Sequence, residues 1–165
     1  MKNNLSYIIC LFLFVVLFFH NKINANEISF SASEILITDN GNIANAGQGS
    51  AYSEVDNIKI DGESFKFDKN NSILIANNAR TILSEKNIEL IADQLIYDQK
   101  VSTIKALGNV EINDLLNNIQ FKSEEAIYNK NKRAITSNTK SSLLDKPGNN
   151  FITEQFIYTF DDNLI

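Results

Sequence analysis

The stretch at residues 87–112, NIELIADQLIYDQKVSTIKALGNVEI, decides the fold, because it has the pattern of one bent β-hairpin. Ile88 and Leu90 fall on one parity of the sequence, and Leu95 and Tyr97 fall on the other. Successive side chains of a strand point to opposite faces, so a change of parity within one strand requires a bulge or a corner. The first arm of the hairpin is therefore predicted to bend near its middle.

The second arm returns after a polar turn at residues 98–100, which Asp98 is well suited to start. Ile104 and Val110 share one parity in this arm, and Gly108 lies between them. Glycine inside a strand is typical of a bend or of a close approach of the backbone. Both arms are thus predicted to bend.

The same pattern recurs along the chain with a period of about 30 residues. Three columns define it: Ile28, Ile58, Ile88, Ile119 and Asn149; Phe30, Ile60, Leu90, Phe121 and Phe151; and Ile37, Phe67, Tyr97, Tyr128 and Tyr158. The steps in the third column are 30, 30, 31 and 30 residues. A fixed period of this kind indicates stacked structural repeats.

We therefore predict an all-β domain at residues 27–165, built from four and a half bent antiparallel hairpins, the last one incomplete. Stacked hairpins of this shape form two facing sheets joined at their corners, which is an elongated, partly open β-jelly-roll. A right-handed parallel β-helix is the alternative repeat fold, with shorter turns and regular Gly or Asn ladders. The polar hairpin turns favour the antiparallel arrangement.

Residues 1–25 have the pattern of a secretory signal peptide, with a short basic start, an apolar run at residues 7–19 and a cleavage site after Ala25. An uncleaved membrane anchor is the alternative interpretation. The apolar run of 13 residues is shorter than the roughly 17 to 20 that a membrane-spanning helix needs. Cleavage is therefore the predicted outcome.

Loss of residues 1–25 would remove Lys2, Lys22, Cys10 and His20, which leaves 13 of the 15 basic residues and all 20 acidic ones, a net charge near −7. Nucleic acid is excluded as a partner, because phosphate binding needs concentrated basic residues. A chain without Cys or His has no thiol chemistry, no zinc finger and no Ser-His triad. We predict no catalytic site, no metal and no cofactor.

An acidic column recurs at the predicted corners, at Glu63, Asp93, Glu124 and Glu154. Equivalent positions of successive hairpins are two strands apart, or about 9.6 Å. Carboxylates at that separation cannot share one cation without other donors, because calcium needs ligands at about 2.3 to 2.6 Å. These residues are predicted to be solvated and to bond the local backbone.

Two phrases, IELIADQLIYD at residues 88–98 and IKALGNVEI at 104–112, resemble the repeat of the OstA-like lipopolysaccharide-transport family. That repeat reads roughly I-x-A-D-x-hydrophobic-x-Y-D followed by A-x-G-N-V. The resemblance covers residues 27–165 and is weaker in the copies at 58–68 and 119–129, and only the third copy has the complete A-x-G-N-V. The family includes LptA-like periplasmic bridge proteins and the N-terminal domains of LptD-like outer-membrane proteins.

The resemblance implies a protein without enzymatic activity that shields the acyl chains of lipopolysaccharide in the periplasm, at the outer membrane. Its implied partners are lipopolysaccharide, other lipopolysaccharide-transport proteins joined by edge-strand addition, and the outer membrane through a following barrel if the chain continues. Each exposed acyl CH₂ costs about 0.8 kcal/mol, so a chain of about a dozen carbons needs a shield worth roughly 10 kcal/mol. A ligand-free structural or adhesive repeat protein with a closed core is the alternative.

The candidate lipid-lining residues are the inward positions of the hairpins. They are Ile28, Phe30, Ile58, Ile60, Phe67, Ile88, Leu90, Leu95, Tyr97, Ile104, Val110, Phe121, Tyr128, Phe151, Phe156 and Tyr158. The same residues would form the core of a closed sandwich, so the pattern alone leaves both interpretations open.

The end of the chain gives a further expectation. The return arm begins seven residues after Tyr97, at Ile104, and the same step from Tyr158 leads to Ile165. Residues 151–160 are therefore predicted to form an edge without a return strand. Either a continuing chain, which we favour, or another molecule would supply the missing strand.

Overall fold

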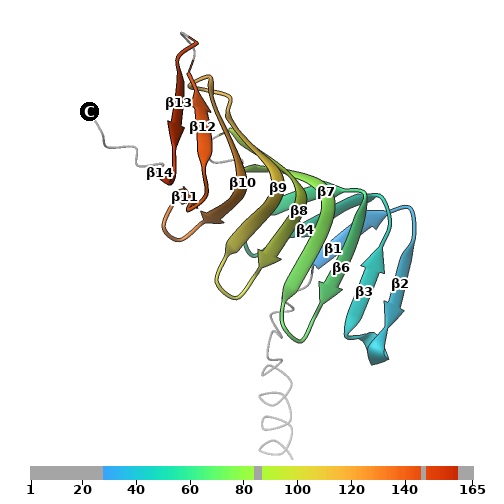
Figure 1. The fold of residues 1–165 in the computed structure, drawn as a ribbon. Coiled ribbons are helices and arrows are strands. Elements are labelled where there is room, and N and C mark those ends of the chain that lie inside the picture. Colours follow the sequence, from blue (N-terminus) through green and yellow to red (C-terminus); the bar gives the residue numbers. More distant parts are fainter. Residues whose placement is uncertain (1–27, 84–86, 146–147, 160–165) are drawn as a thin grey trace, which may run out of the picture.

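One antiparallel sheet of 14 strands forms the described part of the protein, and this sheet is not closed (Figure 1). The structure, a computed structural model, describes residues 28–83, 87–145 and 148–159. A single turn of 3-10 helix, η1 at Asp39–Gly41, joins β2 to β3. The strands are β1 (Ile28–Ala32), β2 (Ile35–Thr38), β3 (Ile43–Ala46), β4 (Gly49–Ser53), β5 (Ile58–Gly62), β6 (Ser64–Asp68), β7 (Ile73–Leu83), β8 (Ile88–Asp98), β9 (Thr103–Asp114), β10 (Ile119–Asn129), β11 (Ala134–Ser137), β12 (Ser141–Leu144), β13 (Asn150–Thr153) and β14 (Phe156–Thr159).

The sheet folds over into two layers that share the four long strands β7 to β10. Layer A has the order β1-β4-β5-β7-β8-β9-β10-β12-β13, and layer B has the order β2-β3-β6-β7-β8-β9-β10-β11-β14. Every pairing between described strands is antiparallel. The predicted all-β stack of bent hairpins is confirmed, and the parallel β-helix is wrong.

The corners lie where the sequence changes parity. The pairing of β8 with β9 shifts between Ile91 and Gln94, and the pairing of β10 with β9 shifts between Ser123 and Glu125. Gly108 has a φ of +73° at the same bend. A left-handed backbone and a shifted register together turn the strand from one layer into the other.

The register confirms the second and third sequence columns as continuous rows. Residues directly opposite each other in an antiparallel pair point to the same face, so each row forms part of the inward surface. One row runs through Phe30, Ala51, Ile60, Thr81, Leu90, Ile112, Phe121, Leu143 and Phe151. The other runs through Ile37, Ala44, Phe67, Leu74, Tyr97, Ile104, Tyr128, Ile135 and Tyr158.

Asn149 departs from the predicted first column. It precedes β13 and lies in a turn, where its backbone N–H and its side-chain Nδ2 donate to the two carboxylate oxygens of Asp145 at 2.8 and 3.0 Å. A side-chain acceptor at the start of a turn competes with the strand ladder for these donors. The prediction of an inward strand position for Asn149 is therefore wrong.

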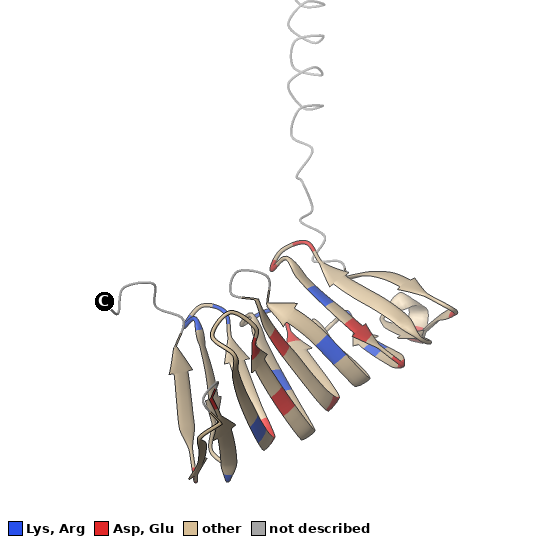
Figure 2. Ribbon diagram, turned by 90° about the horizontal axis from the view of Figure 1, so that it is seen from above, with Lys and Arg blue, Asp and Glu red and all other residues tan. Residues whose placement is uncertain are grey.

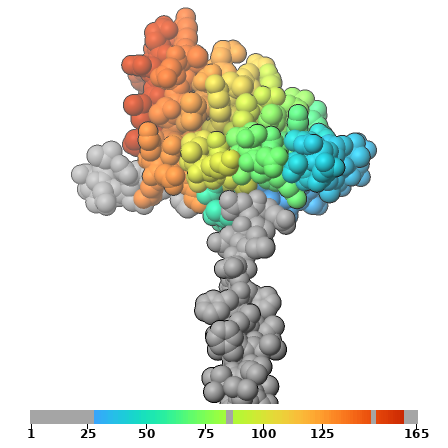
Figure 3. All heavy atoms as spheres, turned by 90° about the horizontal axis from the view of Figure 1, so that it is seen from below, coloured from blue at the N-terminus to red at the C-terminus, as the bar shows by residue number. Residues whose placement is uncertain are grey.

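The repeats follow one another in chain order across the molecule, as the colours of Figure 3 show. Charges of both signs alternate on neighbouring strands (Figure 2), in ion pairs such as Lys122 with Glu111 at 2.7 Å and Lys105 with Glu125 at 3.1 Å. Exposed pairs of this kind add little stability, so the fold depends on the interior. Within the described residues, no helix has the length and apolar character needed to cross a membrane.

Within residues 28–83, 87–145 and 148–159, the chain passes between the layers at the corners, along one long side of the molecule. The opposite side, which we call the mouth, is bordered by hairpin turns that each stay within one layer. The layer B turns are stacked by backbone hydrogen bonds, from Gln99 to Ser72 at 3.1 Å and from Lys130 to Ser102 at 3.1 Å. No covalent connection spans the mouth within the described part of the chain. The predicted signal peptide at residues 1–25 and the return arm at Ile165 lie outside the described residues.

Candidate functional site

The centre of the interior is a packed apolar core. Twelve of the sixteen candidate lining residues are buried, and the side chains of Leu90, Leu95, Tyr97 and Val110 among them are inaccessible to water. The buried residues of the two layers form one hydrophobic cluster. The twelve are Ile28, Ile58, Ile60, Phe67, Ile88, Leu90, Leu95, Tyr97, Ile104, Val110, Phe121 and Tyr128.

The same apolar face is open at its two ends. At the end formed by β2, Ile37 is 61% exposed although it belongs to the inward row. At the other end Phe151 is 55% exposed, and Phe156 and Tyr158 are half-buried. Phe121 stacks on Phe156 with ring centroids 4.7 Å apart, so the apolar surface continues from the core to this edge. Phe30, the remaining candidate, is half-buried at the β1 end.

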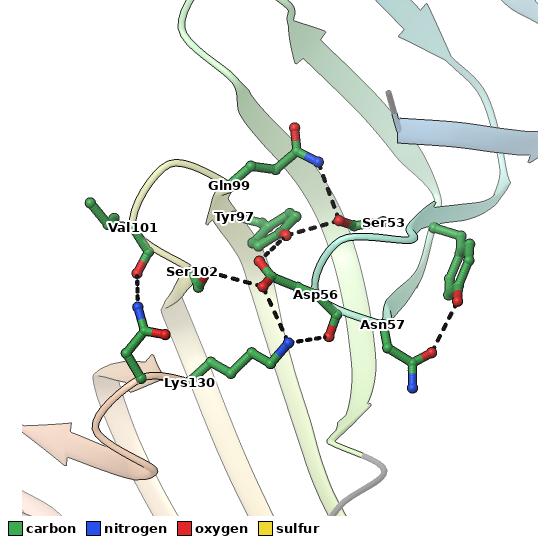
Figure 4. A network of polar contacts seen from close by, with 10 residues as sticks. Ser53, Asp56, Asn57, Tyr97, Gln99, Val101, Ser102 and Lys130 are labelled. Carbon is green, nitrogen blue, oxygen red and sulfur yellow. Dashed lines mark hydrogen bonds and ion pairs between the residues drawn. The ribbon is translucent and has the colours of Figure 1, made fainter. Parts of the chain in front are cut away.

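A polar cluster closes the middle of the mouth (Figure 4). The Tyr97 hydroxyl of layer B donates to Asp56 Oδ2 of layer A at 2.5 Å and lies 3.0 Å from Ser53 Oγ. Gln99 Nε2 donates to Ser53 Oγ at 3.2 Å, and Ser102 Oγ donates to Asp56 Oδ1 at 3.0 Å. These bonds join the turn between β4 and β5 to the turn between β8 and β9.

Lys130, in the turn between β10 and β11, completes this cluster. Its ammonium group donates to the Asp56 backbone oxygen at 2.8 Å and to Asp56 Oδ1 at 3.2 Å. Asp56 is only 7% exposed, and its carboxylate is paired with the half-buried ammonium group of Lys130 and with several hydrogen-bond donors. Burial and the hydrogen bond to Asp56 together raise the pKa of Tyr97 well above its ordinary value.

The surroundings of Tyr97 correct one expectation. The sequence predicted an apolar environment for this residue, and its ring does lie in the core, whereas its hydroxyl lies in the polar cluster. The repeat pattern did not indicate the other residues of this cluster, which include Asp56, Ser53, Ser102 and Lys130. A tyrosine repeated at an inward position was the available indication, because a buried hydroxyl needs a hydrogen-bond partner.

A second tyrosine of the same row makes an equivalent contact. The Tyr158 hydroxyl on β14 of layer B donates to Asp114 Oδ2, at the layer A end of β9. Burial and this hydrogen bond raise the pKa of Tyr158 to about 12. Burial alone would raise the pKa of Asp114, but hydrogen bonds from Tyr158 and from Asn117 and Leu116 outweigh it and lower that pKa.

The acidic corner residues are exposed, as predicted, but two of them have different partners from those expected. Glu63 Oε2 accepts from Asn78 Nδ2 at 2.7 Å, and Asp93 Oδ2 accepts from Asn109 Nδ2 at 2.9 Å. The donors are side-chain amides of the next strand and not the local backbone. No group of three His, Cys, Asp or Glu side chains that could hold a metal ion occurs among the described residues.

Comparison with known proteins adds no relative. No model of a known protein family matches the chain, and no curated protein sequence is significantly similar to it. The function is therefore inferred from the repeat phrases, the two inward rows and the contacts across the mouth.

Proposed function

We propose that this protein is a periplasmic lipid-carrying module of the OstA-like lipopolysaccharide-transport type, which shields acyl chains between its two layers. The supporting observation is that two inward rows extend from edge to edge and that each has one exposed end, Ile37 in the layer B row and Phe151 in the layer A row. A self-sufficient core would bury such side chains at its ends. Open ends suit a surface that continues into another molecule or onto a ligand.

The inward rows are long enough to cover an acyl chain. Neighbouring strands are about 4.8 Å apart, so rows that cross nine strands span roughly 38 Å. An acyl chain lying along these rows would replace the contacts that the layers now make with each other, while its sugar head group stays in water at the mouth. Because Leu90 and Leu95 are fully buried, binding at the centre requires the layers to separate on the mouth side.

The partners proposed for this module are other lipopolysaccharide-transport proteins. Within the described residues, β1 and β2 form one edge of the two layers, and β13 and β14 form the other. Edge strands present unpaired N–H and C=O groups to a further strand. Strand addition at either edge would extend the apolar rows into the partner.

A ligand-free structural or adhesive repeat protein is the second candidate. The specific observation in its favour is the tight packing at the centre, where both layers share one hydrophobic cluster. A permanently closed core would use the exposed ends only for assembly.

Site-specific photo-crosslinking separates these candidates. Phe121 and Gln120 are neighbours on β10, and Phe121 belongs to the inward row whereas Gln120 bonds Asn113 on the outer face. A photoreactive residue at Phe121 should capture lipopolysaccharide, and one at Gln120 should not. Inward positions Ile88 and Tyr128 should behave as Phe121 does, with outward Glu89 as their control. Equal labelling of inward and outward positions would reject the carrier.

A further inference from the structure

The closure of the mouth depends on two interlayer contacts of the same chemical kind. Tyr97 and Tyr158 occupy the same inward row, and each donates its hydroxyl to an aspartate of layer A, Asp56 and Asp114 respectively. Both aspartates lie at or beside hairpin turns on the mouth side of layer A. The row thus carries a repeated Tyr–Asp contact across the mouth, where the described residues make no covalent connection between the layers.

We propose that these two Tyr–Asp contacts are clasps that hold the layers together at the mouth and set how often it opens to admit an acyl chain. This inference rests on the proposed carrier function for its ligand, although the opening itself can be measured without lipid. The device is a side gate, because its bonds break when the layers separate while the corners stay intact.

Polar contacts suit a closure that must open. The net contribution of a hydrogen bond in a protein is small, because water replaces it when it breaks. Gln99 Oε1 is a buried acceptor that has no hydrogen-bond partner among the described residues, so hydration on opening would give this atom a partner. The aspartates and Lys130 would likewise become hydrated, whereas an apolar seal would expose surface that water does not solvate.

The corner side offers a matched control. Three buried serines and the half-buried Thr139 form a hydroxyl cluster where β10, β11 and β12 meet, with Ser141 Oγ donating to Ser123 Oγ at 3.0 Å. The serines are Ser123, Ser137 and Ser141. Ser141→Ala removes buried hydrogen bonds, as Tyr97→Phe does. It removes them on the corner side, where the chain connects the two layers. The two variants therefore separate opening of the mouth from a general loss of stability.

The first experiment measures opening with a thiol. Ala106 is fully buried on the inward face, opposite Leu95, so Ala106→Cys in a Cys10→Ser background reports access of a water-soluble thiol reagent to the interior. Adding Tyr97→Phe, which removes the bonds to Asp56 and Ser53, should accelerate labelling about tenfold or more, since a lost hydrogen bond to a charged group changes an equilibrium by roughly that factor. Asp56→Ala also removes the acceptor of Ser102 and Lys130, so it should accelerate labelling at least as much. Ser141→Ala should leave the rate unchanged at concentrations of denaturant where all variants are folded. Equal rates in all four proteins would overturn the clasp.

The second experiment links opening to uptake of a fluorescent long-chain fatty acid. In one double variant, Asp56→Cys and Ser102→Cys are joined by a short bismaleimide, which ties the two layers together across the mouth. In the control variant, the same reagent joins Ser102→Cys and Asn131→Cys, which ties two turns of layer B to each other. The first cross-link should abolish uptake, and the second should not. Uptake that is the same with both cross-links would overturn the gate. Faster labelling of Ala106→Cys without binding of the fatty acid to any variant would reject the carrier function and leave the clasp supported.

Discussion

Gly108 lies directly against Asp93 at the bend shared by β8 and β9, and a Cβ atom at residue 108 would stand 2.5 Å from Asp93 Oδ2. Asn109, the next residue, also has a positive φ, 46°, and its amide donates to the same oxygen. The glycine provides space and backbone freedom, and the asparagine provides a donor in a conformation that it tolerates. Ala92-Asp93 of the first repeat phrase and Gly108-Asn109 of the second therefore meet at one corner.

Gly108→Ala should lower the free energy of unfolding by about 2 to 3 kcal/mol. Alanine would have to adopt a left-handed backbone, and its Cβ atom would force the Asp93 side chain to move. Gly148→Ala is the control, since Gly148 has a φ of +90° and open space around its Cβ position. This control should cost about 1 kcal/mol. Urea unfolding measures both values, and equal losses would show that the contact with Asp93 contributes nothing.

The sequence was sufficient to predict the corner at residues 92 and 93 and the inward rows, because period-two alternation determines which face each side chain occupies. It could not predict which turn of layer A meets which strand of layer B. That choice depends on the twist and offset of two layers, and the contact between Tyr97 and Asp56 joins residues 41 positions apart. The mouth clusters were missed for this reason, whereas local features such as the Asp98 carboxylate accepting from the Lys100 N–H followed from the turn chemistry.

Burial is another property that the sequence predicts only in part. Phe121 and Phe151 have the same place in their repeats and in one row, yet the first is buried and the second is 55% exposed. The alternation pattern predicts the face of a residue but not whether another strand or layer covers it. Lipid lining and a closed core use identical inward residues, so the alternation pattern is the same for both.

Replacement of the clasp tyrosine tests the environment of its hydroxyl. Tyr97→Asp should destabilise the protein by about 3 to 5 kcal/mol, since a second carboxylate would be buried close to Asp56. Tyr97→Phe keeps the ring in the core and should cost only about 1 to 2 kcal/mol, for the lost hydrogen bond. Denaturant unfolding distinguishes the two. A Tyr97→Asp variant as stable as Tyr97→Phe would show that residue 97 faces water.

Alkaline pH should weaken the second clasp. Tyr158 has a pKa of about 12 in the folded protein, above the value of about 10 for an unperturbed tyrosine. A folded-state pKa above the unfolded value means that the contribution to stability is complete below about pH 10 and is lost as the pH rises toward 12. Unfolding of the parent should therefore become easier between these pH values by a larger margin than unfolding of Tyr158→Phe. Parallel pH profiles for the two proteins would show that the hydroxyl makes no buried contact.

The exposed edge at β14 leads to the last prediction. Ile157 is 75% exposed on β14, which pairs with β11 and with no other strand among the described residues. Apolar side chains beside unpaired backbone groups favour addition of a strand from another molecule. The purified protein should form oligomers whose size increases with concentration, as measured by sedimentation velocity.

Ile157→Pro and Ile157→Thr together identify the cause of that assembly. Proline removes a backbone donor from the edge and is tolerated in edge strands, so Ile157→Pro should keep the protein monomeric if assembly uses strand addition. Threonine keeps the donor and the β propensity while reducing the apolar surface, so Ile157→Thr should still assemble, with a weaker dependence on concentration. If both variants stay monomeric, the oligomer is held by the Ile157 side chain and not by a backbone ladder. A parent protein that remains monomeric at high concentration would show that this edge accepts no second copy, and the extended rows would then need a different partner.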